Sequence, residues 1–256
     1  MTISPPIQYA RGAGLASLIT VTLGAQPALG NVLVAVIGSR DVAVSTVTQN
    51  NVAWSKQKEN VYSDCHVEIW LGVVGANASP IISVTLPGTV FTDGTVIDVC
   101  EFSGVAANGL DQTASNGATS GTLDTGTTPP TTQADELWIG GITLSGGYDM
   151  PGATNGFTLI DGVAFTWVRV GYFWKIVNTI GSANTGTANW SNDWSGCIAT
   201  FKASVPTNTH NVTFQSSPEL NVRIDVTDTG QSVITPQTIP IAEGYHTIQA
   251  EAEVTR

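Results

Sequence analysis

The stretch Gly94-Thr-Val-Ile-Asp-Val-Cys-Glu-Phe-Ser-Gly-Val105 predicts the fold. In an extended chain, Val96, Cys100 and Phe102 point to one face, and Ile97 and Val99 point to the other. Apolar residues on both faces are typical of a strand in the middle of a sheet that is covered by another layer. We therefore expect residues 95–102 to form a central strand of a large β-sandwich.

Strand signals recur along the first 204 residues, whereas the spacing of an amphipathic helix is nearly absent. Gly, Pro, Asn and Asp separate the apolar runs, notably at residues 24–27, 75–80 and 87–94. Many short strands with long connections are typical of an antiparallel sandwich, and at this length of a jelly roll. The strands are expected at residues 16–23, 31–37, 42–49, 53–59, 65–74, 81–86, 95–102, 136–144, 156–160, 164–177 and 194–203.

The Thr- and Gly-rich run between residues 105 and 135 is predicted to be a long loop. Because compact domains rarely contain so long a loop, we expect short strands within it, near residues 112–114 and 121–125. Pro129-Pro130 then favours an extended approach to the next strand.

The residue pattern changes after Ser204, and residues 205–210 are expected to form a linker. Apolar residues then alternate with polar ones along residues 220–227 and again along residues 246–255, as in half-buried antiparallel strands. We therefore predict two domains, a jelly-roll-like sandwich over residues 1–204 and a small β domain over residues 205–256.

The composition favours a surface covered by uncharged polar residues. Hydrophobic residues make up 42% of the 256, and charged residues make up only 11%. Nine basic and twenty acidic residues give a net charge of −11, which argues against binding to nucleic acid or to anionic lipid. No run of 18 apolar residues occurs, so no membrane insertion is expected. A missing secretory signal suits a removed leader or a phage protein released by lysis.

The cysteines Cys65, Cys100 and Cys197 lie on apolar strand patterns and are expected to be buried free thiols. One disulfide stays open as an alternative, although the odd number and wide spacing argue against a disulfide framework. The same spacing matches no zinc motif.

Several short motifs in residues 3–204 resemble a β-sandwich module found in bacterial extracellular proteins and phage virion proteins. The resemblance implies a fold and a virion or extracellular setting, and it brings no catalytic signature. The motifs are Asn31-Val-Leu-Val-Ala-Val-Ile37, Trp54, Val67-Glu-Ile-Trp70, Glu101-Phe-Ser-Gly-Val105 with Leu110-Asp111, Gln133-Ala-Asp-Glu-Leu137 and Cys197-Ile-Ala-Thr-Phe-Lys202.

The C-terminal part is similar to PEGA-type domains, which are small β modules attached to surface proteins. Ser217-Pro218, Val222-Arg-Ile-Asp225, Thr235-Pro236 and Gly244-Tyr-His246 stand in the order of that family. The family's usual Asp-Gly turn is replaced by Asp225-Val-Thr-Asp-Thr-Gly230, and its closing Gly-Tyr is missing. An immunoglobulin-like module is the alternative.

Catalytic residues are scarce in this sequence. His66, His210 and His246 are its three histidines, and none has the setting of a Ser-His-Asp or Cys-His arrangement. Cys65 adjoins His66, but neighbours in a strand point to opposite faces.

Paired carboxylates are the remaining route to catalysis, since two of them can cleave a glycoside. Glu68, Asp98 and Glu101 lie on predicted strands, and neighbouring positions of these strands in one sheet would bring them together. Asp98 shares a face with Val96 and Cys100, so a structural hydrogen bond is the favoured interpretation for it. We predict no catalytic residues.

A bound cation and a bound sugar are the remaining possibilities. Calcium ligands could come from Asp111, Asp149, Asp161 and Asp193, but no EF-hand run is present, and no cofactor or metal site is predicted. Trp54, Trp138, Trp167 and Trp174 fit core or sheet-face positions. Tyr148, Trp190 and Trp194 stand in polar loops beside Asn and Asp, where they could stack on sugars or cap the core.

These observations favour a non-enzymatic structural protein of a phage virion, such as a capsid decoration or tail-associated protein. Its partners would be other virion or surface proteins, in a homo-oligomer or another symmetric assembly. A carbohydrate-binding or host-adhesion module of an extracellular protein is the alternative, and a polysaccharide-acting enzyme is a weaker one.

Overall fold

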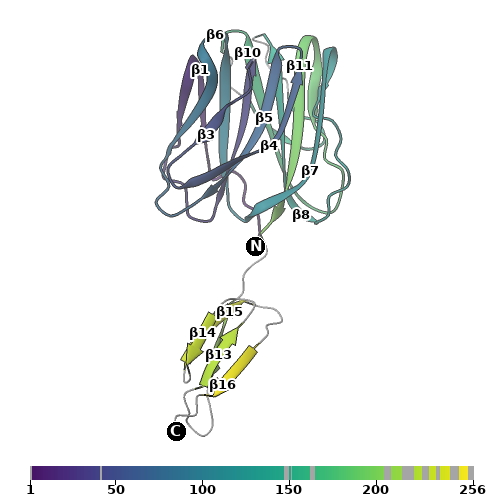
Figure 1. Cartoon of the computed structure of the whole chain (residues 1–256). Helices are drawn as coiled ribbons and strands as arrows, with labels where there is room; N and C mark the ends of the chain where they lie inside the picture. The colour runs from purple at the N-terminus through teal and green to yellow at the C-terminus, as the bar shows by residue number, and fades with distance from the viewer. Residues whose placement is uncertain are drawn as a thin grey trace. The chain divides into compact units, whose positions relative to one another are not determined.

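The structure is a computed structural model that describes residues 2–40, 42–146, 150, 152–161, 165–204, 209–214, 222–226, 231–234, 237–242 and 248–252. At residues 89–93 and 161, and beyond residue 204, it describes the backbone alone. All elements in these ranges are β-strands, so the all-β fold class is confirmed (Figure 1). The chain divides into two compact units, Met1–Ser204 and Val205–Arg256.

One antiparallel sheet of the larger unit contains the first six strands. Its order is β1-β6-β2-β5-β4, and β3 pairs with β6. The strands are β1 (Gln8–Thr22), β2 (Val32–Arg40), β3 (Thr46–Thr48), β4 (Val52–Tyr62), β5 (Cys65–Val74) and β6 (Ile81–Phe102).

The other antiparallel sheet contains the next five strands in the order β7-β11-β8-β10-β9. The strands are β7 (Val105–Asp124), β8 (Asp135–Ser145), β9 (Thr158–Asp161), β10 (Val168–Asn178) and β11 (Gly186–Ala203). The chain completes the first sheet before it enters the second. A jelly roll instead moves between its sheets within each Greek key, so the observed order supports a two-sheet sandwich but not jelly-roll connectivity.

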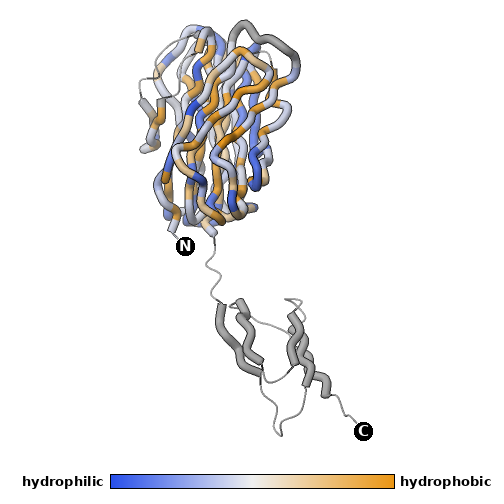
Figure 2. The backbone as a smooth tube through the Cα atoms, turned by 90° about the vertical axis from the view of Figure 1, so that its left-hand side faces the viewer, coloured by the Kyte–Doolittle hydropathy of each residue, from blue (hydrophilic) through white to orange (hydrophobic). Residues whose placement is uncertain are grey.

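The main core lies between the two sheets. Val96, Cys100 and Phe102 of β6 belong to it, together with apolar residues of β2, β5, β8, β10 and β11. The sheets approach closely at Gly141 of β8, where a Cβ atom would lie 2.6 Å from Cγ1 of Val36. The tube in Figure 2 shows hydrophobic segments recurring along the strands of this unit.

Two further apolar clusters cover the outer faces of the sheets. Ile97 and Val99 pack with Leu33 of β2 in one cluster, under residues from the later part of β1, the first part of β6 and β3. The outer face of the second sheet carries the other cluster, which includes Trp138, Phe157 and Trp194. The central strand predicted at residues 95–102 is confirmed, with both of its faces buried.

Two predicted interruptions of the strands are wrong. Residues 87–94, expected to be a turn, lie inside β6, and residues 105–124 form the single strand β7 instead of a loop. The Ser103-Gly104 turn joins the two sheets. Gly104 has φ +76°, and a Cβ atom there would lie 2.4 Å from the carbonyl oxygen of Thr2, so both the conformation and the space call for glycine.

The second unit has five described strands in two antiparallel sheets, β12-β15 and β14-β13-β16. They are β12 (Thr209–Phe214), β13 (Val222–Val226), β14 (Gln231–Ile234), β15 (Gln237–Ala242) and β16 (Ile248–Ala252). The two alternating runs of the sequence contain β13 and β16, which pair with each other. His210 lies in β12 and not in a linker.

Candidate functional site

The three cysteines are buried free thiols, as predicted. Burial raises the pKa of the Cys100 thiol to about 12, and it also raises the pKa of the Cys197 thiol. Since the thiolate is the reactive form, these two side chains act as small apolar residues of the core.

The three carboxylates considered for glycoside cleavage do not meet. Asp98 points into the main core, where it forms an ion pair of 3.2 Å with Arg11 of β1. Glu68 accepts hydrogen bonds from the backbone N–H of Val44 and the indole N–H of Trp70, both at 2.7 Å.

The carboxylate of Glu101 also accepts several short hydrogen bonds. It accepts hydrogen bonds from Gln8, the backbone N–H of Ala28 and Asn31, at 2.6 to 2.8 Å. These partners fix the segment between β1 and β2 against β6. All three carboxylates therefore serve as structural anchors.

A carboxyl pair that the sequence pattern did not reveal crosses the second sheet. Glu136 of β8 is fully buried, accepts the indole N–H of Trp138 at 3.0 Å, and hydrogen-bonds to Asp111 of β7. Burial and the neighbouring Asp111 raise the pKa of Glu136 to about 7. Although burial opposes it, hydrogen bonds from Thr132 lower the pKa of Asp111 to about 2. Lys202 lies 3.4 Å from the Asp111 carboxylate, so a cation stands beside the pair.

Of the four aspartates considered for calcium, the structure describes the side chains of two, and each of these has its own partners. Asp111 is held by Thr132 and Lys202, and Asp193 accepts a hydrogen bond from Thr119. Asp149 lies outside the described residues, and only the backbone of Asp161 is described. Among the described residues, no group of three or more His, Cys, Asp and Glu side chains is placed to hold a metal ion.

The aromatic residues considered for sugar stacking have different positions. Tyr148 lies outside the described residues. Trp190 and Trp194 lie in β11 and not in a loop. Trp194 is 2% exposed and donates its indole N–H to the carbonyl of Ser120, so its ring offers no face to a sugar. Trp190 is partly buried against the outer cluster of the second sheet.

Trp167, expected in the core or on a sheet face, is instead 59% exposed. It borders a depression of about 340 Å³ at the end of β8 and the start of β10, beside β7 and β11. We call this the Trp167 depression. Its lining residues are Thr119, Ser145, Gly146, Trp167, Asn192 and Asp193.

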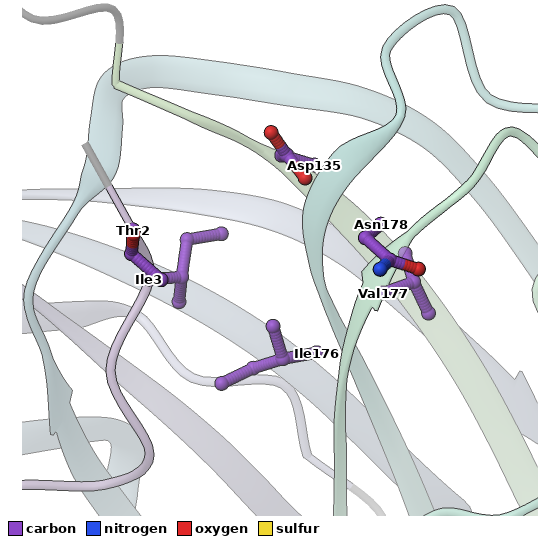
Figure 3. A pocket seen from close by; sticks show the side chains of 6 residues that line it. All are labelled: Thr2, Ile3, Asp135, Ile176, Val177 and Asn178. Carbon is purple, nitrogen blue, oxygen red and sulfur yellow. The ribbon is translucent and has the colours of Figure 1, made fainter.

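A larger pocket, of about 480 Å³, lies where the N-terminal segment approaches the start of β8 and the end of β10. Figure 3 shows Ile3 and Ile176 at its apolar part, with Thr2, Asp135 and Asn178 around them. One carboxylate and two neutral polar side chains do not make an acid–base pair, so this pocket has no evident catalytic chemistry.

The free edge of β1 is the most distinctive apolar surface. β1 lies at the end of the first sheet, and residues 8–14 pair with β6 in unbroken register. Tyr9 is 58% exposed, the preceding Ile7 is 54% exposed, and Leu15 and Leu18 follow along the strand. Arg11, the one charged residue of β1, forms an ion pair with Asp98.

In the part of the chain that the structure describes, no helix is long and apolar enough to cross a membrane. No family model, curated protein or solved structure matches the chain.

Proposed function

We propose that this chain is a non-enzymatic structural protein that assembles through the edge of β1, in the setting of a phage virion or an extracellular surface. The observation that carries the proposal is the free edge of β1, whose residues 8–14 pair without a bulge and contain the exposed Tyr9 but no Lys or Pro. Lys and Pro normally protect an edge strand from pairing with another chain. Without them, its free N–H and C=O groups pair readily with another strand.

A second copy of this chain is the partner that fits this edge best. Two identical edges can pair in antiparallel fashion across a twofold axis, which gives every free backbone group of one strand a partner on the other. Tyr9 and Ile7 would then leave water together. The net charge of −11 opposes contact between copies, but β1 itself contains no acidic residue.

The virion setting rests on three features of the chain: the two all-β units, a polar surface with few charges, and the motif resemblance of residues 3–204. The non-enzymatic character rests on the carboxylates Glu68, Asp98 and Glu101, each held by structural partners, and on the buried thiols. Co-sedimentation of the chain with phage particles tests the setting. A protein that stays in the supernatant of every particle preparation would contradict it.

Light scattering of the full chain over a range of concentrations tests assembly. We expect the wild-type chain to form oligomers and the Tyr9→Lys variant to shift their formation to at least tenfold higher concentration. Ile180→Lys is the matched control, since Ile180 is 60% exposed and lies outside β1. Wild-type monomers at all concentrations, or equal weakening by both substitutions, would contradict assembly through β1.

Carbohydrate binding is the second candidate function. The Trp167 depression favours it, because it joins an exposed aromatic ring to hydrogen-bonding side chains.

A further inference from the structure

The Trp167 depression has the size and composition of a small-ligand site. Its volume of about 340 Å³ lies within the range of known ligand pockets, roughly 300–1,000 Å³. Residues with an indole ring, two hydroxyls, a carboxamide and a carboxylate line it, from β7, β8, β11 and the turn before β10.

The turn before β10 holds Trp167 outside the core. The backbone N–H of Gly146 donates to the carbonyl of Trp167 at 2.7 Å, and Phe165 and Val168 bridge on either side of the turn. Thr166 has φ +47°, a conformation that β-branched residues rarely adopt. The fold thus accepts backbone strain beside a large aromatic ring that stays 59% exposed.

Gly146 lines the depression in a backbone conformation that favours glycine. It has φ +108°, and a Cβ atom there would lie 3.4 Å from the ring of Trp190. A larger residue there would be strained.

Asp193 is fixed as a hydrogen-bond acceptor. Its carboxylate accepts the hydroxyl of Thr119 at 2.5 Å, and hydrogen bonds from Thr119 and Ser63 lower its pKa below the usual range. An ionised carboxylate has about four acceptor positions, so it can bind further hydroxyl groups. Asn192 adds a carboxamide with both donors and an acceptor.

The charges around the depression select against anions. Asp193 is ionised, Arg40 is the cation that acts on it, and Arg40 is itself paired with Asp64. The chain as a whole carries −11. A ligand with a carboxylate or sulfate would therefore be repelled.

We propose that the Trp167 depression binds one uncharged hexose unit of a glycan. The apolar face of the sugar lies on the indole of Trp167, and its hydroxyl groups hydrogen-bond to Asp193 and Asn192. Stacking on an aromatic ring beside directed polar groups is the chemistry that suits a ring with one apolar face and many hydroxyls. The inference deepens the second candidate function and does not depend on assembly through β1.

The test is an array of neutral and sialylated glycans probed with the full chain, followed by titration with free galactose, glucose and N-acetylglucosamine. We expect binding to neutral glycans and at least tenfold weaker binding by Trp167→Ala and by Asp193→Asn. Ile180→Ala is the matched control, because Ile180 is also an exposed apolar residue and belongs neither to β1 nor to the lining of the depression.

Thermal unfolding of each variant checks that the fold is intact. Binding to no neutral glycan, binding to sialylated glycans alone, or binding unchanged in Trp167→Ala would overturn the proposal. Tyr9→Lys separates the two functions: it should lose assembly and keep sugar binding.

Discussion

At the scale of residues, the buried acids of this protein act through local partners. Glu136, Asp111 and Lys202 lie on three neighbouring strands, β8, β7 and β11, with β11 in the middle. Two ionised carboxylates can only accept hydrogen bonds, so a proton on Glu136 is what allows the two groups to bond. The pair therefore makes stability depend on pH.

The free energy of unfolding is expected to fall as pH rises, because the folded protein holds the proton of Glu136 more tightly than the unfolded chain does. The pKa of Glu136 is about 7 in the folded protein against 4.5 for an ordinary glutamate, so its stabilisation is present below pH 4.5 and is lost as pH rises through 7. The loss is on the order of 3 kcal/mol. Asp111, with a pKa of about 2, stays ionised throughout this window.

Urea unfolding at pH 5, 6, 7 and 8 measures this effect. The free energy of unfolding should fall with pH in the wild-type chain and fall less in Glu136→Gln, since glutamine keeps a donor and an acceptor without titrating. Glu59→Gln makes the same substitution at an exposed residue, so the free energy of unfolding should fall with pH as in the wild-type chain. Equal slopes in all three proteins would show that Glu136 is ionised at neutral pH.

The sequence predicted which face of its strand Asp98 occupies, but not which residues contact the buried acids. Alternation along residues 94–105 correctly placed Asp98 on the face of Val96 and Cys100. It could not identify Arg11 as its partner, nor the three donors on Glu101, because these contacts join segments far apart in the chain. Trp167 was assigned to a sheet, since a pattern of residues does not distinguish a strand from the turn before it.

At the scale of elements, the long strands were the hardest to predict. β7 is rich in Gly, Ser, Asn and Thr, which predicts a loop, yet it pairs along most of its length with β11. Tertiary pairing decides its structure. The turn predicted at residues 87–94 failed for the same reason, because β6 continues through it beside β1.

The close approach of the two sheets at Gly141 should make this position intolerant of any side chain. Gly141→Ala would place a methyl group 2.6 Å from Cγ1 of Val36 and 3.0 Å from Cγ2 of Val67. We expect the free energy of unfolding to fall by about 1–3 kcal/mol, the usual effect of overpacking a core.

Gly24→Ala serves as the control for Gly141→Ala, since a Cβ atom at Gly24 meets nothing closer than 3.9 Å. Urea unfolding of both variants provides the comparison. A Gly141→Ala protein as stable as the Gly24→Ala protein would mean that the sheets are further apart than described.

At the scale of the whole molecule, apolar clusters lie on both outer faces of the larger unit, and its sheet edges are where unpaired backbone groups remain for a partner strand. The recurring strand signals correctly indicated an all-β chain, and the composition indicated an ample core. It could not show which strand would lie at an edge, because that depends on the order β1-β6-β2-β5-β4.

Hydrogen exchange of the β1 amides, measured on the full chain below and above its assembly concentration, tests the central claim most directly. If copies pair along this edge, exchange at residues 8–14 should slow on assembly in the wild-type chain and stay fast in Tyr9→Lys at the same concentration. Oligomers that form while the exchange of β1 is unchanged would contradict assembly through this edge.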